Sequence, residues 1–405
     1  MHRTPGDAIN STRFEQLRRT RPVALAAAGL LLAGCTGATA AASSPAAPPA
    51  PVPADVSITP TDGTDTVLPN GVVTVTAKSG MLNHVDVSDP AGVYLLGTYN
   101  PTHTVWTSAA PLVPDSKYAV SVSATGPKGD SSTDTSGFVT AAVDAAKRLL
   151  VAQVTPADGD TVGVAYPLVV QFNHSVINRE DVTKALQVTT SPHVDGAWYW
   201  IDAQTVDYRP EGFWPAGTVV KLDSNLTGVS GGNGLWGVKN MASSFTVGRQ
   251  QIIKVNVKTH KMSVVRDGKT IASFPVSTGK PGWETRDGTK VIMEKVLNKH
   301  WTNAAIDAPE HYSLYSAHAM RMTNSGEFIH DAPWNTGNIG EANTSHGCVG
   351  MTVSDMDWLY DHTLVGDAVV VTGSPKPYTE IYNRYQDWNV SWSKWQTGNY
   401  NLSDG

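Results

Sequence analysis

The chain has 405 residues, a formal net charge of −6 and 16% charged side chains. This length allows two to four domains, each with its own hydrophobic core. The acidic balance argues against nucleic acid as a partner, and no apolar run reaches the ~20 residues that a membrane span needs. Abundant Val, Thr, Gly, Pro, Trp and Tyr predict a mainly β protein of short strands and tight turns.

The start of the chain is typical of an export signal. An arginine-rich stretch precedes a short apolar run over 22–34. The run leads into Leu-Ala-Gly-Cys at 32–35, which resembles a bacterial lipobox, whose cysteine is lipidated and becomes the mature N-terminus. We expect a signal peptide at 1–35 and a lipid on Cys35 that anchors the protein to the outer face of the cell membrane. A Pro/Ala/Ser tether at 36–51 would let it reach into the cell wall; a plain signal peptide is the alternative.

Two similar blocks follow the tether. The pattern Thr-Pro-x-Asp-Gly, followed by apolar alternation, begins at Thr59 and again at Thr155. A repeat of about a hundred residues has the size of one β-sandwich domain. We predict immunoglobulin-like sandwiches at 52–147 and 148–249, acting as spacers between the membrane and the remainder of the chain.

The third region, 250–374, alternates between apolar and polar residues. Its first hairpin is predicted to turn at Asp267-Gly268, the strongest short hairpin signal. Ser354 is a candidate N-cap for one short helix. Further strands are predicted at 288–296, 318–324, 327–330 and 366–373.

The last segment, 375–405, is rich in tryptophan. Trp388, Trp392 and Trp395 recur at helical spacing. We predict that this tail docks on the third region, 250–374.

Cys348 is the only cysteine besides Cys35. If Cys35 carries lipid, Cys348 is an unpaired thiol in an oxidising compartment, where it needs a task. A thiol attacks a carbonyl as the thiolate, which a nearby imidazole generates. The Ser345-His346-Gly347-Cys348 run and His330 upstream supply two imidazoles and a glycine that leaves backbone N–H groups open to an oxyanion.

His330, followed at this interval by Ser-His-Gly-Cys, resembles the signature of the L,D-transpeptidases. Thr285 and Gly288 are similar to the family's Thr-x-x-Gly turn. The segment 330–334 and the tryptophan-rich tail resemble the mycobacterial and actinobacterial branch, which carries tandem immunoglobulin-like domains. The resemblance implies two such sandwiches followed by an L,D-transpeptidase-type catalytic β-sandwich.

The resemblance also implies an acyltransferase of peptidoglycan maturation. Cys348 would attack a tetrapeptide stem after its third residue, expel D-Ala and form a thioester, and the amine of a neighbouring stem would then give a 3→3 cross-link. His330 would be the base, oriented by the backbone carbonyl of Asp331. The amides of Gly347 and Cys348 would bind the oxyanion, and His346 would shape the turn. The remaining implied substrate contacts are Tyr312, Ser325, Gly326, Trp334 on the lid loop, Ser345 and Gly350.

Carbapenems, which acylate this family's cysteine, are expected inhibitors, and no cofactor or metal is expected. Gly350 departs from the family pattern, which usually has Asn two residues after the nucleophile. Loss of one side-chain contact there would weaken catalysis by about 1 kcal/mol.

Other interpretations stay open. Cys348 could be a buried structural cysteine, or it could bind zinc together with the two histidines. A sortase pattern needs an arginine closely downstream, yet the next one is Arg384; a papain-like order needs a later histidine, and only His362 follows. Gly350 favours a last alternative, a catalytically weak or inactive wall-binding lipoprotein.

Overall fold

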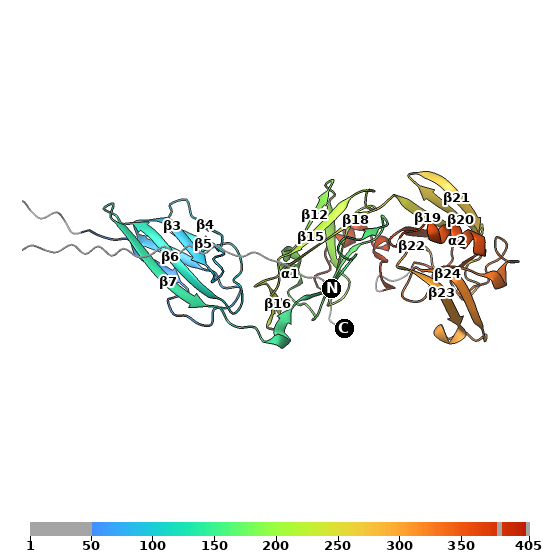
Figure 1. Ribbon diagram of the computed structural model, residues 1–405, viewed down its shortest axis with the longest axis horizontal. Coiled ribbons are helices and arrows are strands. Elements are labelled where there is room, and N and C mark those ends of the chain that lie inside the picture. Colours follow the sequence, from blue (N-terminus) through green and yellow to red (C-terminus); the bar gives the residue numbers. More distant parts are fainter. Residues whose placement is uncertain (1–50, 379–382, 402–405) are drawn as a thin grey trace, which may run out of the picture. The chain divides into compact units, whose positions relative to one another are not determined.

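The computed structural model describes residues 51–378 and 383–401, and its secondary structure is mainly β, as predicted (Figure 1). The expected signal peptide, the lipidation site Cys35 and nearly all of the tether lie outside the described residues. Within the described part, no helix has the length and apolar character to cross a membrane.

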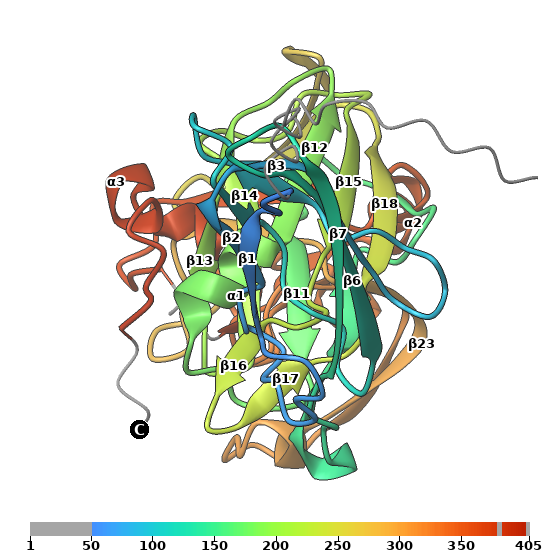
Figure 2. The same ribbon diagram turned by 90° about the vertical axis from the view of Figure 1, so that its left-hand side faces the viewer.

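The first sandwich has two antiparallel sheets. Its β6–β7 hairpin is visible in both Figure 1 and Figure 2. One sheet has the order β1 (Asp55–Thr59), β2 (Thr74–Ser79), β5 (Val105–Ser108), β4 (Gly97–Tyr99); the other has β3 (Met81–Ser88), β6 (Lys117–Thr125), β7 (Ser131–Val139). Alternate residues of β6 are buried, as expected for strands with one face on a core. That core, which includes Trp106, Leu112 and Phe138, contains residues of this sandwich alone.

The second sandwich packs two four-stranded sheets. They are β10 (Thr161–Val162), β18 (Met241–Val247), β15 (Val219–Ser224), β12 (Leu186–Ser191) and β13 (Gly196–Trp200), β14 (Thr205–Pro210), β11 (Leu168–Phe172), β9 (Val151–Thr155). A small sheet of β16 (Ser230–Gly232), β17 (Leu235–Gly237) and β8 (Arg148–Leu149) and the helix α1 (Arg179–Ala185) complete it. Its core also contains Val291, Ala368 and Tyr385, which belong to the third region and the tail. The second sandwich is therefore more than a spacer.

The third region is built from two more sheets. They are β21 (Lys269–Pro275), β20 (Lys261–Arg266), β19 (Gln251–Asn256), β27 (Ala368–Thr372), β22 (Gly288–Val291) and β23 (Glu294–Thr302), β24 (Ser313–Arg321), β25 (Phe328–Asp331), β26 (Val349–Met351). The β20–β21 hairpin turns at Asp267-Gly268 as predicted, with φ of 49° and 75°. A shared core lies between the sheets and includes Ile329 and Val349, the neighbours of the two predicted reactive side chains.

The one helix predicted in this region is α2 (Val353–Asp361), which packs against β24 and β25. Its N-cap is Thr352, whose hydroxyl accepts from the Asp355 amide at 3.2 Å. The predicted cap, Ser354, was wrong because it lies within the first turn. Both residues carry a capping hydroxyl, and only the extended backbone of Thr352 decides between them.

The tail contacts the second sandwich as well as the catalytic region. It forms η5 (Asp387–Asn389) and α3 (Trp392–Trp395), and its indole groups contact the second sandwich: Trp388 donates to the Ala165 carbonyl and Trp395 to the Ala197 carbonyl, each at 2.8 Å. Contacts to the catalytic region include Asn389, bonded to the backbone of Thr289, and Gln386, which donates to the Met322 carbonyl.

The reason for this docking is Arg209 of β14. Its buried guanidinium lies 4.3 Å from the ring centre of Trp395, 4.9 Å from that of Trp388 and 5.5 Å from that of Trp392. Such cation–π contacts are strongest where water is excluded. The tail thus connects the second sandwich to the catalytic region.

Candidate active site

The nucleophile turn is held by its own hydroxyl and by a neighbouring loop. The Ser345 hydroxyl donates to the Cys348 carbonyl at 2.6 Å and accepts from the Gly347 amide at 3.1 Å. Gly347 has φ of +115°, which a side chain at this position would strain. The buried Thr285 hydroxyl donates to the Gly347 carbonyl at 2.8 Å and accepts from Gly279. Of the two amides predicted for the oxyanion, that of Gly347 is therefore engaged within the turn.

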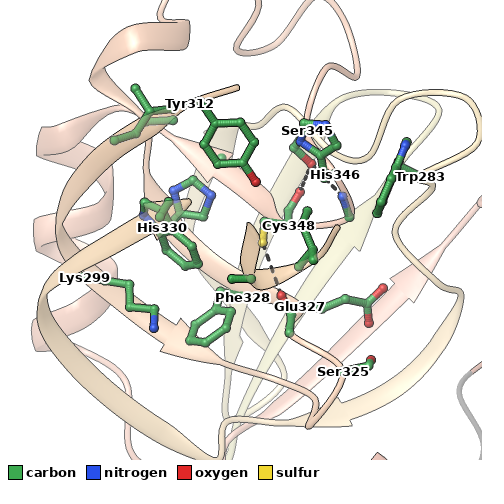
Figure 3. Close-up of a pocket in the computed structure, with 18 of the residues that line it drawn as sticks. Trp283, Lys299, Tyr312, Ser325, Glu327, Phe328, His330, Ser345, His346 and Cys348 are labelled. Carbon is green, nitrogen blue, oxygen red and sulfur yellow. Dashed lines mark hydrogen bonds between the residues drawn. The ribbon is translucent and has the colours of Figure 1, made fainter. Parts of the chain in front are cut away.

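Cys348 carries a protonated thiol. Its sulfur donates to the Gly326 carbonyl at 3.6 Å, and Figure 3 shows it between the His330 ring on one side and Glu327 and Phe328 on the other. Burial raises the pKa of the thiol to about 12, and the negative charge of Glu327 adds to the increase. This environment therefore favours the protonated thiol over the thiolate.

His330 is positioned as a neutral base. Its Nδ1 lies 2.8 Å from the Asp331 carbonyl, as the predicted orientation requires. With that nitrogen donating, Nε2 carries the lone pair that accepts a proton. Burial lowers the pKa of His330, which favours the neutral imidazole. The ring lies between Trp301, at 4.7 Å between ring centres, and Trp334, at 5.8 Å.

Sequence reasoning missed the support behind His330. Trp301 donates to the Ser316 hydroxyl at 2.8 Å, and Ser316 donates to the Asp331 carbonyl at 2.6 Å. The Asp331 carboxylate accepts from the backbone amides of Ala317 and His318, so it serves the sheet rather than the imidazole. The alternation along β23 and β24 indicates strands, but it does not indicate that they meet behind the base.

His346 lies on a different wall from His330. Its Nε2 is 3.0 Å from a carboxylate oxygen of Glu310, and its ring contacts those of Tyr312 and Trp283. Glu310 also pairs with Lys280, and both partners lower the pKa of this carboxyl to about 2. Glu310 had no sequence signal, since it lies in the loop that connects β23 and β24.

Tyr312 presents a protonated hydroxyl to the site. Burial, then the proximity of Cys348, raises the pKa of Tyr312. Figure 3 shows the hydroxyl directed towards the cysteine. It can therefore donate a hydrogen bond to negative charge that develops next to the sulfur.

Ser325 is fixed from two sides. Its hydroxyl accepts from Arg286 at 2.9 Å and from the tail residue Asn383 at 2.8 Å. The next residue but one, Glu327, is buried and accepts from the Arg286 amide at 2.9 Å. The tail thus contributes to the wall that the resemblance assigned to substrate.

One cavity of about 590 Å³ gathers the predicted residues. Its walls include Cys348, His330, His346, Gly347, Tyr312, Ser325, Gly326, Trp334, Ser345 and Gly350. Asp331 does not line the cavity; its backbone carbonyl accepts a hydrogen bond from His330 Nδ1. A cavity of this size accommodates a peptide stem, and its reactive sulfur lies beside a base and a hydroxyl donor. The arrangement suits acyl transfer through a covalent cysteine adduct.

Gly350 sits in a hydrogen-bonded bridge with Ser277: its amide donates at 2.7 Å and its carbonyl accepts at 3.0 Å. A Cβ there would have ordinary van der Waals contacts, the nearest being 3.4 Å from Ala332. The departure from Asn is therefore not imposed by space. As for zinc, the described residues contain no group of three or more His, Cys, Asp or Glu that could hold a metal ion.

Comparisons with known proteins agree with this geometry. A family model described as a bacterial Ig domain matches residues 64–230, and one described as the L,D-transpeptidase catalytic domain matches residues 250–371. The chain is 32% identical to L,D-transpeptidase 5 of Mycobacterium tuberculosis over 400 residues, 95% of this chain and 86% of the relative. It is 32% identical to L,D-transpeptidase 2 of the same species over 343 residues, 84% of this chain and 83% of the relative.

Among solved structures, the L,D-transpeptidase LdtMt1 in complex with imipenem is 31% identical, with a TM-score of 0.49; the match covers 55% of this chain and 98% of that one.

Proposed function

Because this chain belongs to the L,D-transpeptidase family, we propose that it forms 3→3 cross-links in peptidoglycan through a thioester on Cys348. The observation that carries the proposal is the convergence of Cys348, His330 and Tyr312 on one cavity large enough for a stem peptide. The donor is a tetrapeptide stem, cleaved between its diamino acid and D-Ala.

In the first half-reaction, His330 Nε2 takes the thiol proton as the sulfur attacks the carbonyl carbon. The negative charge on the carbonyl oxygen is stabilised by the Tyr312 hydroxyl and the Cys348 amide. The carbon–nitrogen bond then breaks, and the imidazolium returns the proton to the leaving amine. A thioester on Cys348 and free D-Ala result.

In the second half-reaction, the side-chain amine of another stem attacks the thioester. The neutral His330, held by the Asp331 carbonyl, accepts a proton from this amine, and the thiol is regenerated. The neutral resting pair supports this cycle, because the same imidazole must accept and donate once in each half.

We also propose that carbapenems acylate Cys348, since their strained carbonyl meets the same nucleophile and base. For the location, we propose that the lipobox cysteine Cys35 anchors the enzyme to the outer face of the cell membrane. The motif at 32–35 supports this part of the proposal.

The test is intact-protein mass spectrometry of the ectodomain with a tetrapeptide-stem disaccharide or a carbapenem. We expect a covalent adduct on the wild-type chain and none on Cys348→Ala. An unmodified wild-type protein, with its fold verified by circular dichroism, would contradict the proposal and favour an inactive wall-binding protein.

The same assay measures the departure at Gly350. We expect Gly350→Asn to fold, because its Cβ has room, and to raise the acylation rate by up to about tenfold, the equivalent of 1.4 kcal/mol. An unchanged rate would show that the amide at this position is dispensable here.

A further inference from the structure

Lys299 of β23 lies in the wall of the active-site cavity, partly buried. Its ammonium group is 5.5 Å from the ring centres of both Trp301 and Phe328. Among the residues that the structure describes, no carboxylate forms an ion pair with it. Two aromatic faces therefore hold a cation whose charge no acid compensates.

The arginines of the same wall are already neutralised. Arg321 lies 2.7 Å from a Glu294 oxygen, and Arg286 lies 3.5 Å from a Glu327 oxygen. Lys376 is the other lysine that lines the cavity. Lys299 is therefore a positive charge of this wall that no acid compensates, in a protein whose net charge is −6.

Lys299 and His330 share a neighbour. The Trp301 ring contacts the His330 imidazole, with 4.7 Å between ring centres, on the strand that also carries Lys299. Figure 3 shows Lys299 and His330 on one side of the Cys348 sulfur, with Ser325 on the other. The cavity thus has a basic end beside the imidazole.

The chemistry of the reaction determines which part of the substrate lies at this basic end of the cavity. When the thioester forms, the bond between the carbonyl carbon and the leaving nitrogen breaks, and the imidazolium gives its proton to that nitrogen. The departing amino acid must therefore have its nitrogen beside His330. In a tetrapeptide donor, the carbon bonded to this nitrogen also bears the free carboxylate of the chain.

We infer that Lys299 binds the α-carboxylate of the amino acid that leaves the donor stem, and so selects donors with a single residue after the scissile bond. With a second residue present, a neutral amide replaces the carboxylate and leaves the ammonium without a partner. This inference rests on the proposed function. It adds the residue that would make the enzyme select tetrapeptide over longer donor stems.

The same contact serves the second half-reaction. The attacking amine of a 2,6-diamino diacid sits on a carbon that carries a carboxylate, as does the amine of a free amino acid. Since this amine must also lie beside His330, its carboxylate reaches the same ammonium. Lys299 thus recognises the same chemical unit, an amine next to a carboxylate, in the amino acid that leaves in the first half-reaction and in the acceptor that attacks in the second.

The experiment compares two donors, a tetrapeptide stem ending in D-Ala and the same stem ending in D-alaninamide. The kcat/KM of acylation is measured for the wild type, Lys299→Gln, Lys299→Arg and the matched control Lys376→Gln. We expect the wild type to prefer the free acid by about tenfold or more, equivalent to 1.4 kcal/mol. Lys299→Gln should lose this preference through slower reaction of the acid alone, Lys299→Arg should keep part of it, and Lys376→Gln should keep it fully.

Equal slowing of both donors by Lys299→Gln, or an unchanged preference, would overturn the inference while leaving the proposed function intact. A wild-type protein that forms no adduct on Cys348 with either donor would overturn the proposed function, and this inference with it. Thermal unfolding of each variant separates a loss of preference from a loss of fold.

Discussion

The two amino-terminal sandwiches begin with the same sequence pattern but play different structural parts. The core of the first consists of its own residues, such as Trp106. The core of the second includes Val291 and Ala368 of the catalytic domain and Tyr385 of the tail. Similar sequence blocks can therefore produce one self-contained module and one that is part of its neighbour. What differs is the apolar surface that the following domain supplies.

The contrast revises the view of both sandwiches as spacers. Only the first, residues 52–147, has the closed core that a spacer needs. The second shares its core with the catalytic domain and the tail. The same tail places Asn383 against Ser325 in the cavity wall. Four measurements can break or sharpen this contrast.

The largest effect is expected from deletion. Removing 52–147 should leave the thermal midpoint of the remaining chain and the acylation of Cys348 almost unchanged. Removing 52–249 should expose Ala368 and the tail tryptophans to water, lower the midpoint by about 10 °C or more and abolish acylation. Calorimetry and adduct mass spectrometry test both, and equal behaviour of the two truncations would disprove the contrast.

A smaller change should come from single tryptophans. Trp395 is fully buried, stacks on Tyr199 at 4.8 Å and covers Arg209. We call the second sandwich, the catalytic domain and the tail together the catalytic unit. Trp395→Ala should lower the free energy of unfolding of this unit by about 3–5 kcal/mol. The matched control is Trp106→Ala, at a buried tryptophan of the first sandwich, which should lower the free energy of unfolding of that domain alone. Urea unfolding followed by domain-specific hydrogen exchange distinguishes them.

The stability of the junction between the tail and the second sandwich, where Asp387 and Asp207 are buried, should also depend on pH. Burial raises the pKa of Asp387 to about 7, and burial together with Asp387 raises that of Asp207. The folded state therefore holds protons that the unfolded state releases near pH 4, so the stability that these two carboxyls contribute is greatest below that pH and is lost as pH rises through 7. Asp387→Asn should flatten this fall in the thermal midpoint between pH 5 and pH 8. Asp134→Asn in the first sandwich should not, and an equal change from both variants would rule out the junction as the source.

The smallest effect concerns one hydroxyl. Tyr166 of the second sandwich lies 3.3 Å, oxygen to oxygen, from Tyr385 of the tail. Tyr166→Phe should destabilise the catalytic unit by about 0.5–1.5 kcal/mol. Tyr118→Phe removes a comparable bond, to the Val113 amide, within the first sandwich and should not affect the catalytic unit. Denaturant midpoints of the two variants provide the check, and a catalytic unit that is indifferent to Tyr166→Phe would argue against tail docking.

Much of the reactive centre could be predicted from the sequence, because many of its interacting groups are close together along the chain. Ser345 to Cys348 form one turn, and Gly347 supplies the backbone angle that the turn requires. Asp267-Gly268 likewise specifies its hairpin within two residues. In these cases the interacting groups are close along the chain, so their local pattern is sufficient to identify them.

Only the tertiary structure decided which distant groups serve the site. Trp301 and Ser316 meet behind His330 because β23, β24 and β25 pair in one register. Glu310 reaches His346 across 36 residues. The tail selects the second sandwich because Arg209, far upstream, is buried where three indoles can cover it. Such contacts depend on strand register and on the partner surface that remains unfilled, and both are properties of the packed chain rather than of any segment within it.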